Sequence, residues 1–257
     1  MTNDLEFFDA CACIGLPAAA PVGVPDPPGA SAEELLAAMD RAGIAKALVW
    51  HAAQRDGDPL LGNDLLAEAL AGRDRLVGVW AILPTPCGEL GDLDEWLGRA
   101  MAGNVRAFKA FCEQGRYLLR GEVIGDVVER LLAARLPLIL PVATEPAWRD
   151  AYDLLAEFPE LTVILTDLPS WGADRYFRPL LGRYPNVHVE ISGYIVDGGL
   201  EALVADYGAA RALFGSNYPV MPHGGMMLTL AHAEIDDADK QAIAAGNLQR
   251  LIAKVRA

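Results

Sequence analysis

Two carboxylates are the strongest acid–base candidates in this sequence. Asp167 follows the apolar segment 162–166, and Glu190 alternates with apolar residues in the segment 187–192. Two carboxylates in one cavity can raise the pKa of one of them, which produces a usable general acid or base. Alternatively, a cation such as Lys109 holds either carboxylate in a structural ion pair, or Lys109 itself anchors an anionic substrate.

Cys11 and Cys13 lie two residues apart in the segment 7–13, so an extended chain would point both to one face. Three interpretations stay open. The thiolates could bind a soft metal with Asp167 as a third ligand. One thiolate could contact substrate or act as a nucleophile, or both could be small apolar fillers. A disulfide between them is disfavoured because their side chains would run parallel.

Further polar and aromatic side chains follow other apolar segments. His51 and His223 could overhang a cavity or serve the structure, and Asn217 could donate a hydrogen bond to a substrate oxygen without titrating. Tyr194 and Trp171 come just after two segments and could line the same cavity, although aromatic loop residues as often serve packing. Asn217 is thus a catalytic candidate, and His51, Tyr194 and His223 join Cys11, Cys13 and Lys109 as candidates for substrate binding.

All of these candidates lie at or near the end of an apolar segment. Eight strand-like segments occur, at 7–13, 45–50, 76–83, 105–111, 138–142, 162–166, 187–192 and 212–215. Helix-like stretches separate them, at 60–70, 93–101, 122–134, 146–158, 176–183 and 200–207, with a capping-box pattern at 31–34 and a last helical region from 226 onward. The alternation predicts parallel βαβ construction. Chain length and strand count favour a closed (β/α)8 TIM barrel over an open sheet, and no Gly-rich dinucleotide turn follows the first strand.

A barrel of this kind carries its chemistry at the C-terminal ends of the strands. The alternation in 187–192 predicts that His188, Glu190 and Ser192 face inward. Arg106 and Lys109 have opposite parity in their strand, and the sequence does not tell which of them faces inward.

The strand ends also predict where the site lies. We expect the largest hollow of the protein to include four residues from different strands: Cys13, Asp167, Glu190 and Asn217. The Pro/Ala/Gly-rich stretch 17–28 would form a loop over the same face or a tolerated surface insertion.

Composition limits the class of protein. The 257 residues are 53% hydrophobic and carry a formal charge of −14, so one domain over residues 1–257 can bury a large core. A surface this acidic repels phosphate backbones and anionic lipids, which makes nucleic acid and membranes poor partners. We expect a cytoplasmic protein with four free thiols and a small-molecule substrate, and a homo-oligomer is compatible with the sequence.

The order and spacing of several segments resemble the amidohydrolase-related family of metal-dependent hydrolases and decarboxylases. The segments are 8–15, 136–141, 163–168, 186–192, 213–219 and 246–251. The resemblance covers the whole chain and implies a TIM barrel with its site at the strand C-termini.

Five positions depart from that family. Its strand-1 metal-binding histidines fall on Cys11 and Cys13, its strand-5 histidine on Pro141, its strand-6 histidine on Asp167, and its strand-8 aspartate on Asn217. Pro141 has no donor atom and an asparagine cannot act as a base near neutral pH. We therefore expect no tightly bound metal and no other cofactor, with Asp167 as the first choice of general base and Glu190 as the second.

The resulting hypothesis is a hydrolase-like or lyase-like enzyme of the amidohydrolase superfamily that works without the usual metal. The resemblance implies a small substrate such as a carboxylate or a lactone. The alternative is a barrel that has lost its chemistry and binds a metabolite or a protein partner. The two hypotheses differ in whether Asp167, Glu190 and a histidine converge on one accessible cavity.

Overall fold

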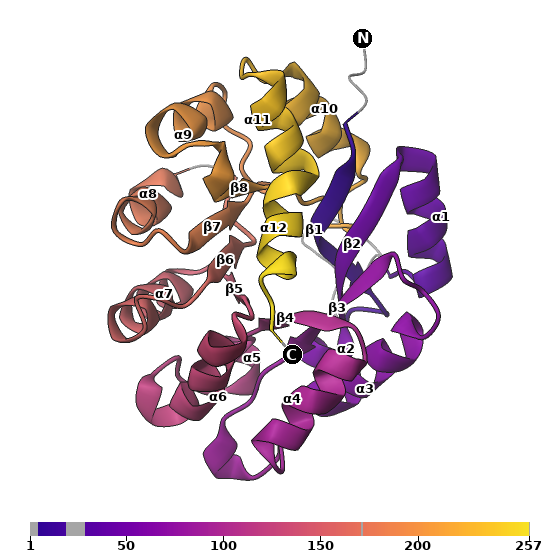
Figure 1. The fold of residues 1–257 in the computed structure, drawn as a ribbon, viewed down its shortest axis with the longest axis vertical. Helices are drawn as coiled ribbons and strands as arrows, with labels where there is room; N and C mark the ends of the chain where they lie inside the picture. The colour runs from indigo at the N-terminus through magenta and orange to yellow at the C-terminus, as the bar shows by residue number, and fades with distance from the viewer. Residues whose placement is uncertain (1–4, 19–28, 171, 257) are drawn as a thin grey trace.

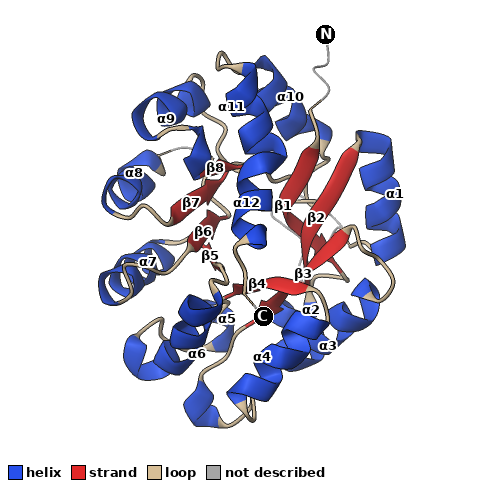
Figure 2. Ribbon diagram, in the orientation of Figure 1, coloured by secondary structure: helices blue, strands red, loops and turns tan. Residues whose placement is uncertain are grey.

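Eight parallel strands form one sheet in the computed structural model, which describes residues 5–18, 29–170 and 172–256. The sheet order is β1-β2-β3-β4-β5-β6-β7-β8, so every strand pairs with its neighbour in the chain. The bounds are β1 Phe7–Ile14, β2 Ile44–His51, β3 Leu76–Ala81, β4 Val105–Lys109, β5 Leu138–Pro141, β6 Val163–Thr166, β7 Val187–Glu190 and β8 Ala212–Leu213. Helices surround the strands (Figures 1 and 2). The predicted (β/α)8 barrel is confirmed.

The sheet closes between β8 and β1 through irregular backbone contacts. The N–H of Ala10 donates to the carbonyl of Phe214 (2.9 Å), and the N–H of Cys13 donates to the carbonyl of Tyr218 (2.8 Å). β8 is shorter than the predicted strand 212–215 because the N–H of Phe214 donates to Ile243 and the N–H of Ser216 donates to the Asp9 side chain. The N–H groups of Phe214 and Ser216 therefore take no part in the hydrogen bonds between parallel strands, although this part of the chain still closes the barrel.

The principal helices follow the predicted amphipathic stretches. They are α1 Ala32–Ala42, α3 Pro59–Leu70, α4 Leu93–Ala102, α6 Gly121–Ala134, α7 Glu145–Glu157, α8 Asp174–Arg183, α9 Gly199–Tyr207, α10 Gly224–His232, α11 Asp237–Gln241 and α12 Asn247–Ala253. Short turns add α2 Ala53–Asp56, α5 Cys112–Gly115, η1 Thr85–Cys87, η2 Ala209–Arg211 and the π-helical η3 Ala242–Gly246. The predicted capping box is present: Ser31 Oγ accepts the N–H of Glu34, and the Glu34 side chain accepts the N–H of Ser31.

Two apolar clusters form the core. The larger one joins the outward faces of the strands to the helices, and the smaller one lies inside the barrel and contains Phe8, Leu48, Val79 and Ile164. α12 closes the N-terminal end of the barrel, where Leu248 and Leu251 join the inner cluster, and Figure 1 shows this helix crossing in front of the strands. The C-terminal ends of the strands are therefore left to form the mouth.

The strand faces follow the predicted alternation where the ladder is regular. In β7, Val187 and Val189 belong to the outer cluster, whereas Glu190 is buried inside. In β1 the register shifts between Asp9 and Ala12, which is a bulge that changes the parity of the strand.

Two predicted features lie wholly or mostly outside the described residues. The predicted loop 17–28 is described only at positions 17 and 18, and Trp171 is not described. Among the described helices, none is long and apolar enough to cross a bilayer.

Candidate active site

A cavity of about 250 Å³ lies at the C-terminal ends of β2, β4, β5 and β6. Its walls come from the strand ends and from α2, α5 and the start of α7. The lining residues are Trp50, Arg55, Lys109, Phe111, Cys112, Glu113, Gln114, Pro141, Ala143, Thr144, Ala147 and Asp167. We call this space the mouth cavity.

Lys109 is the central cation of the mouth cavity. It ends β4 with its side chain turned inward and only 3% exposed. Its Nζ lies 4.6 Å from the ring centre of Trp50 and 5.3 Å from that of Phe111, so two aromatic rings face the ammonium. Arg106 instead donates to the carbonyls of Met101 and Val105, which answers the question of parity that the sequence left open.

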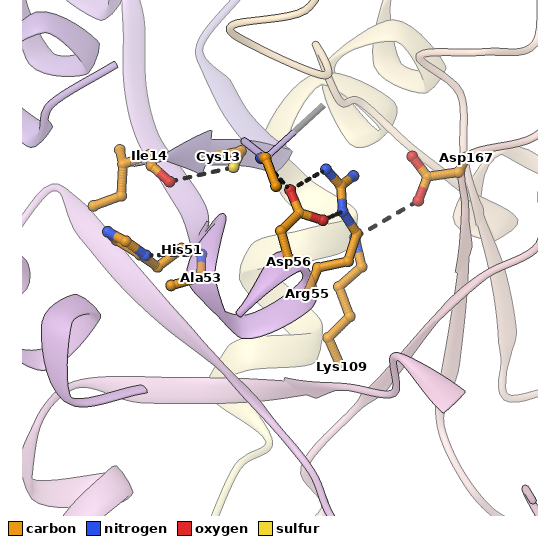
Figure 3. A network of polar contacts seen from close by, with 9 residues as sticks. Cys13, Ile14, His51, Ala53, Arg55, Asp56, Lys109 and Asp167 are labelled. Carbon is orange, nitrogen blue, oxygen red and sulfur yellow. Dashed lines mark hydrogen bonds and ion pairs between the residues drawn. The ribbon is translucent and has the colours of Figure 1, made fainter. Parts of the chain in front are cut away.

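Asp167 faces Lys109 across the cavity (Figure 3). Its Oδ2 lies 3.6 Å from Lys109 Nζ and accepts a hydrogen bond from Thr166 Oγ1 at 3.2 Å. The residue follows β6 with a φ of 58°, a left-handed conformation that aspartate tolerates better than most residues. Its side chain is 32% exposed, so the carboxylate is accessible from the mouth.

A second cation lies on α2. Arg55 binds Asp56 through two hydrogen bonds of 2.6 and 2.8 Å, and its guanidinium lies 5.3 Å from the Trp50 ring centre. Trp50 and Phe111 are 5.2 Å apart. On the opposite wall the Thr144 hydroxyl donates to the Glu113 carboxylate. The cavity thus combines two aromatic rings, tilted by 47° to each other, with two cations.

Glu190 lies beneath the mouth and is not among the residues that line it. It is fully buried, and its oxygens accept the N–H of Ser192 at 2.5 Å and the Ser192 hydroxyl at 2.9 Å. Burial raises the pKa of Glu190 to about 8. It is therefore mostly protonated near neutral pH and is held in the barrel interior.

A buried polar network joins the start of β1 to the segment after β8. Asp9 is 0% exposed and accepts hydrogen bonds from the N–H of Cys11 (2.9 Å), the N–H of Ser216 (2.9 Å) and the Ser216 hydroxyl. His223 Nε2 lies 3.6 Å from Asp9, and its ring stacks on Tyr218 with centroids 4.7 Å apart. Burial raises the pKa of Asp9 and lowers that of His223. His223 therefore supports the closure of the barrel instead of lining the mouth.

Cys11 and Cys13 face the barrel interior, where the charges of Lys109 and Asp167 act on both thiols. Burial raises the pKa of Cys11 well above its usual value and that of Cys13 to about 12. Both therefore stay protonated near neutral pH, which disfavours a thiolate nucleophile or ligand.

The donor set does not fit the divalent metal expected of the family resemblance. Pro141 offers no donor atom, the Lys109 ammonium lies in the same space, and both cysteines are thiols. Within the described ranges, no group of three His, Cys, Asp or Glu side chains could hold a metal ion. Freedom from metal and from other cofactors stays a prediction for metal analysis of the purified protein.

The remaining candidates lie away from the mouth cavity. His51 borders a separate hollow beside Gly15, and Figure 3 shows it apart from the Lys109–Asp167 pair. Tyr194 packs among the helices and donates to Asp174 at 2.8 Å. Asn217 is half-buried with a φ of 55°, and its carbonyl accepts the N–H of Met221.

The sequence predicted that Cys13, Asp167, Glu190 and Asn217 would share the largest hollow, but the mouth cavity does not bring these four residues together. Of these four residues only Asp167 lines the mouth cavity, and a larger hollow of about 880 Å³ lies at the other end of the barrel. The buried networks of Asp9 and Glu190 occupy the side of the mouth near β1 and β7. Asp9 accepts a hydrogen bond from Ser216, which follows β8, and Glu190 accepts one from Ser192, which follows β7.

Most residues that line the mouth cavity were not candidates from the sequence, among them Trp50, Arg55 and Phe111. Trp50 could have been found, because it lies at the end of a predicted strand. Phe111 could have been found on the same ground, because it ends the predicted segment 105–111. Arg55 could not, because it lies on α2, in a stretch where the sequence predicted neither a strand nor a helix.

A comparison with known protein families assigns the chain to one of them. The family model described as Amidohydrolase matches residues 15–252. The chain belongs to the amidohydrolase family. No curated protein sequence matches it.

Several solved structures share this fold. An uncharacterized TIM-barrel protein from Bordetella bronchiseptica is 18% identical with a TM-score of 0.72, covering 97% of this chain and 99% of its own. The 5-carboxyvanillate decarboxylase of Sphingomonas paucimobilis is 16% identical with a TM-score of 0.71, over 97% and 99%. A probable 2-pyrone-4,6-dicarboxylic acid hydrolase from Acinetobacter baumannii, with citric acid bound, is 12% identical with a TM-score of 0.74, over 97% and 100%.

Proposed function

We propose that the mouth cavity binds a small, flat carboxylate and that the protein hydrolyses or decarboxylates it without a catalytic metal. Lys109 would bind the carboxylate, Trp50 and Phe111 would contact the flat body of the molecule, and Asp167 would transfer the proton. The Lys109 ammonium would supply the positive charge that a metal ion supplies elsewhere in the family.

One observation carries this proposal. Lys109 is almost fully buried, yet among residues 5–18, 29–170 and 172–256 its ammonium has no hydrogen-bond acceptor, only Asp167 at 3.6 Å and two aromatic rings. A buried ammonium without hydrogen bonds is costly unless another group satisfies its donors. Because Lys109 lines the cavity, an anion in that space can satisfy them.

Asp167 suits the proton-transfer role by position. It is partly exposed to the cavity and lies beside the cation that would hold the substrate. In hydrolysis of a lactone ring it would take a proton from the water that attacks the ring carbonyl and return it to the ring oxygen as the C–O bond breaks. In decarboxylation it would deliver a proton to the ring carbon as the C–C bond breaks and carbon dioxide leaves. Two solved structures with this fold are named for ring carboxylates: a 5-carboxyvanillate decarboxylase and a probable 2-pyrone-4,6-dicarboxylic acid hydrolase.

A second candidate function is binding without turnover. Asp167, Glu190 and a histidine do not converge on one accessible cavity: Asp167 faces Lys109, Glu190 binds Ser192, and His223 lies against Asp9. A site with one accessible carboxylate can hold an anion without transforming it. Neither candidate involves nucleic acid or membrane partners, given the acidic composition.

The test is a panel of aromatic and lactone-ring carboxylates, screened by melting temperature and by product analysis. We expect at least one to raise the melting temperature of the wild type, and Lys109→Met to abolish that shift. Lys46→Met is the control, because Lys46 is exposed on β2. For an essential proton-transfer group, Asp167→Asn should lower turnover about 10²–10⁴-fold.

The outcomes separate the two functions. Stabilisation that depends on Lys109 but comes without product would favour binding alone. If Lys109→Met responds to the same carboxylates as the wild type, the mouth cavity is not their site.

A further inference from the structure

A second hollow, of about 880 Å³, lies at the end of the barrel opposite the mouth. Its walls come from the residues just before β5, β6, β7 and β8 and from α12, which crosses this end of the barrel in Figure 1. Its volume falls in the range of about 300–1,000 Å³ that is typical of small-molecule sites. We call it the basal cavity.

Four cations line the basal cavity against one carboxylate. They are Arg135 after α6, Arg211 before β8, and Arg250 and Lys254 on and after α12; the carboxylate belongs to Glu160. Within the described part of the chain, none of the four cations forms an ion pair with a carboxylate. In a protein with a formal charge of −14, this local excess of positive charge is the reverse of the overall balance.

Two of the cations are fixed in place. Arg211 donates to the carbonyls of Val187 (2.8 Å) and Tyr184 (2.6 Å), and Arg250 donates to the side chain of Asn247. These contacts hold two guanidinium groups on the cavity wall before any ligand arrives, which lowers the entropy cost of binding one.

The other two cations make no side-chain hydrogen bond to the described residues. Arg135 and Lys254 are exposed residues at the C-caps of α6 and α12. A helix C-terminus favours a cation, which accounts for each residue separately. It does not account for both facing one hollow together with Arg211 and Arg250.

His188 also lines the basal cavity, and its pKa reflects its burial and the positive charge around it. Its Nδ1 is 3.1 Å from the carbonyl of Ala210. Burial, followed by the charges of Arg211, Lys254 and Arg250, lowers the pKa of His188 to about 4. Arg211, Arg250 and Lys254 therefore all lie close enough to His188 for their positive charges to disfavour its protonation.

We propose that the basal cavity is a binding site for a phosphorylated small molecule. Guanidinium groups match the geometry of phosphate oxygens, and four cations suit a ligand with more than one negative charge. Leu131, Leu136 and Leu251 add an apolar wall for the body of such a molecule. This site is separate from the mouth cavity and does not depend on the function proposed for it.

The test titrates inorganic pyrophosphate into the protein by calorimetry at constant ionic strength. We expect saturable binding to the wild type, and a loss of affinity of about tenfold or more in Arg135→Gln/Lys254→Gln. Arg116→Gln/Lys46→Gln is the matched control. It removes the same charge, and Arg116 is also an exposed helix C-cap, with a φ of 56° against 54° for Arg135.

A third variant locates the ligand. Lys109→Met should keep wild-type affinity for pyrophosphate, because Lys109 lies in the mouth cavity. Absence of binding to the wild type, equal losses in the two double variants, or loss in Lys109→Met would each overturn the proposal.

Discussion

Glu190 occupies the space in which a side chain at Gly215 would begin. A Cβ built on Gly215 would lie 2.7 Å from Glu190 Cγ, closer than real Cβ contacts allow. Glu190 is held there by Ser192 through two hydrogen bonds. The end of β8 and the carboxyl group on β7 are therefore fitted to each other inside the barrel.

The first prediction concerns this fit. Gly215→Ala should destabilise the protein by about 1–3 kcal/mol, because the added methyl overpacks a filled interior. Chemical denaturation measures the change. Gly98→Ala on α4 is the control, because a Cβ there has no atom within 4 Å, and it should be neutral or stabilising. Equal stability of Gly215→Ala and the wild type would show that Glu190 moves aside freely.

The second prediction follows from the protonation of Glu190. Its pKa is raised from 4.5 to about 8, so the folded state binds an extra proton between these values and stability falls as pH rises through that window. In Glu190→Gln this loss is absent, so its stability relative to the wild type should increase from pH 5 to pH 8.5. Urea unfolding at both pH values measures the difference. A pH-independent difference would contradict the raised pKa of Glu190.

The third prediction tests the Asp9 network. Ser216→Ala removes the hydroxyl that donates to Asp9 and accepts the N–H of Tyr218 at 3.1 Å. Leaving buried polar groups unsatisfied costs about 1–3 kcal/mol, and in a protein of this size each kcal/mol lowers the melting temperature by about 2–4 °C. Ser170→Ala, at an exposed serine, should leave the melting temperature unchanged. A Ser216→Ala protein as stable as the control would mean that Asp9 does not depend on this serine.

The fourth prediction concerns the thiols. Cys87 is exposed, whereas Cys11, Cys13 and Cys112 are buried, and burial raises the pKa of Cys112 to about 11. A thiol reagent at neutral pH should therefore modify one of the four cysteines quickly in the native protein and all four in denaturant. Cys87→Ser should lose the fast phase. If a fast phase remains in that variant, one of Cys11, Cys13 and Cys112 is reactive. The nucleophile hypothesis returns if Cys11→Ser or Cys13→Ser then removes that phase.

Local patterns in the sequence predicted the parts of this protein that depend on neighbouring residues. Strand and helix alternation predicted the barrel, the alternation in 187–192 predicted that Glu190 faces inward, and 31–34 predicted the capping box. These features depend on backbone geometry with a period of two or 3.6 residues, which a single sequence displays directly.

The tertiary structure decided which strand ends remain open. Glu190 faces inward as its strand parity predicted, and Asp167 follows the end of β6, yet Asp167 lines the mouth cavity and Glu190 is buried beneath it against Ser192. The bulge in β1 and the closure through Asp9 and Ser216 fill the other side of the mouth. Cavity position and the raised pKa of Glu190 depend on how side chains distant in sequence fill a shared volume and exclude water, and no local pattern contains that information.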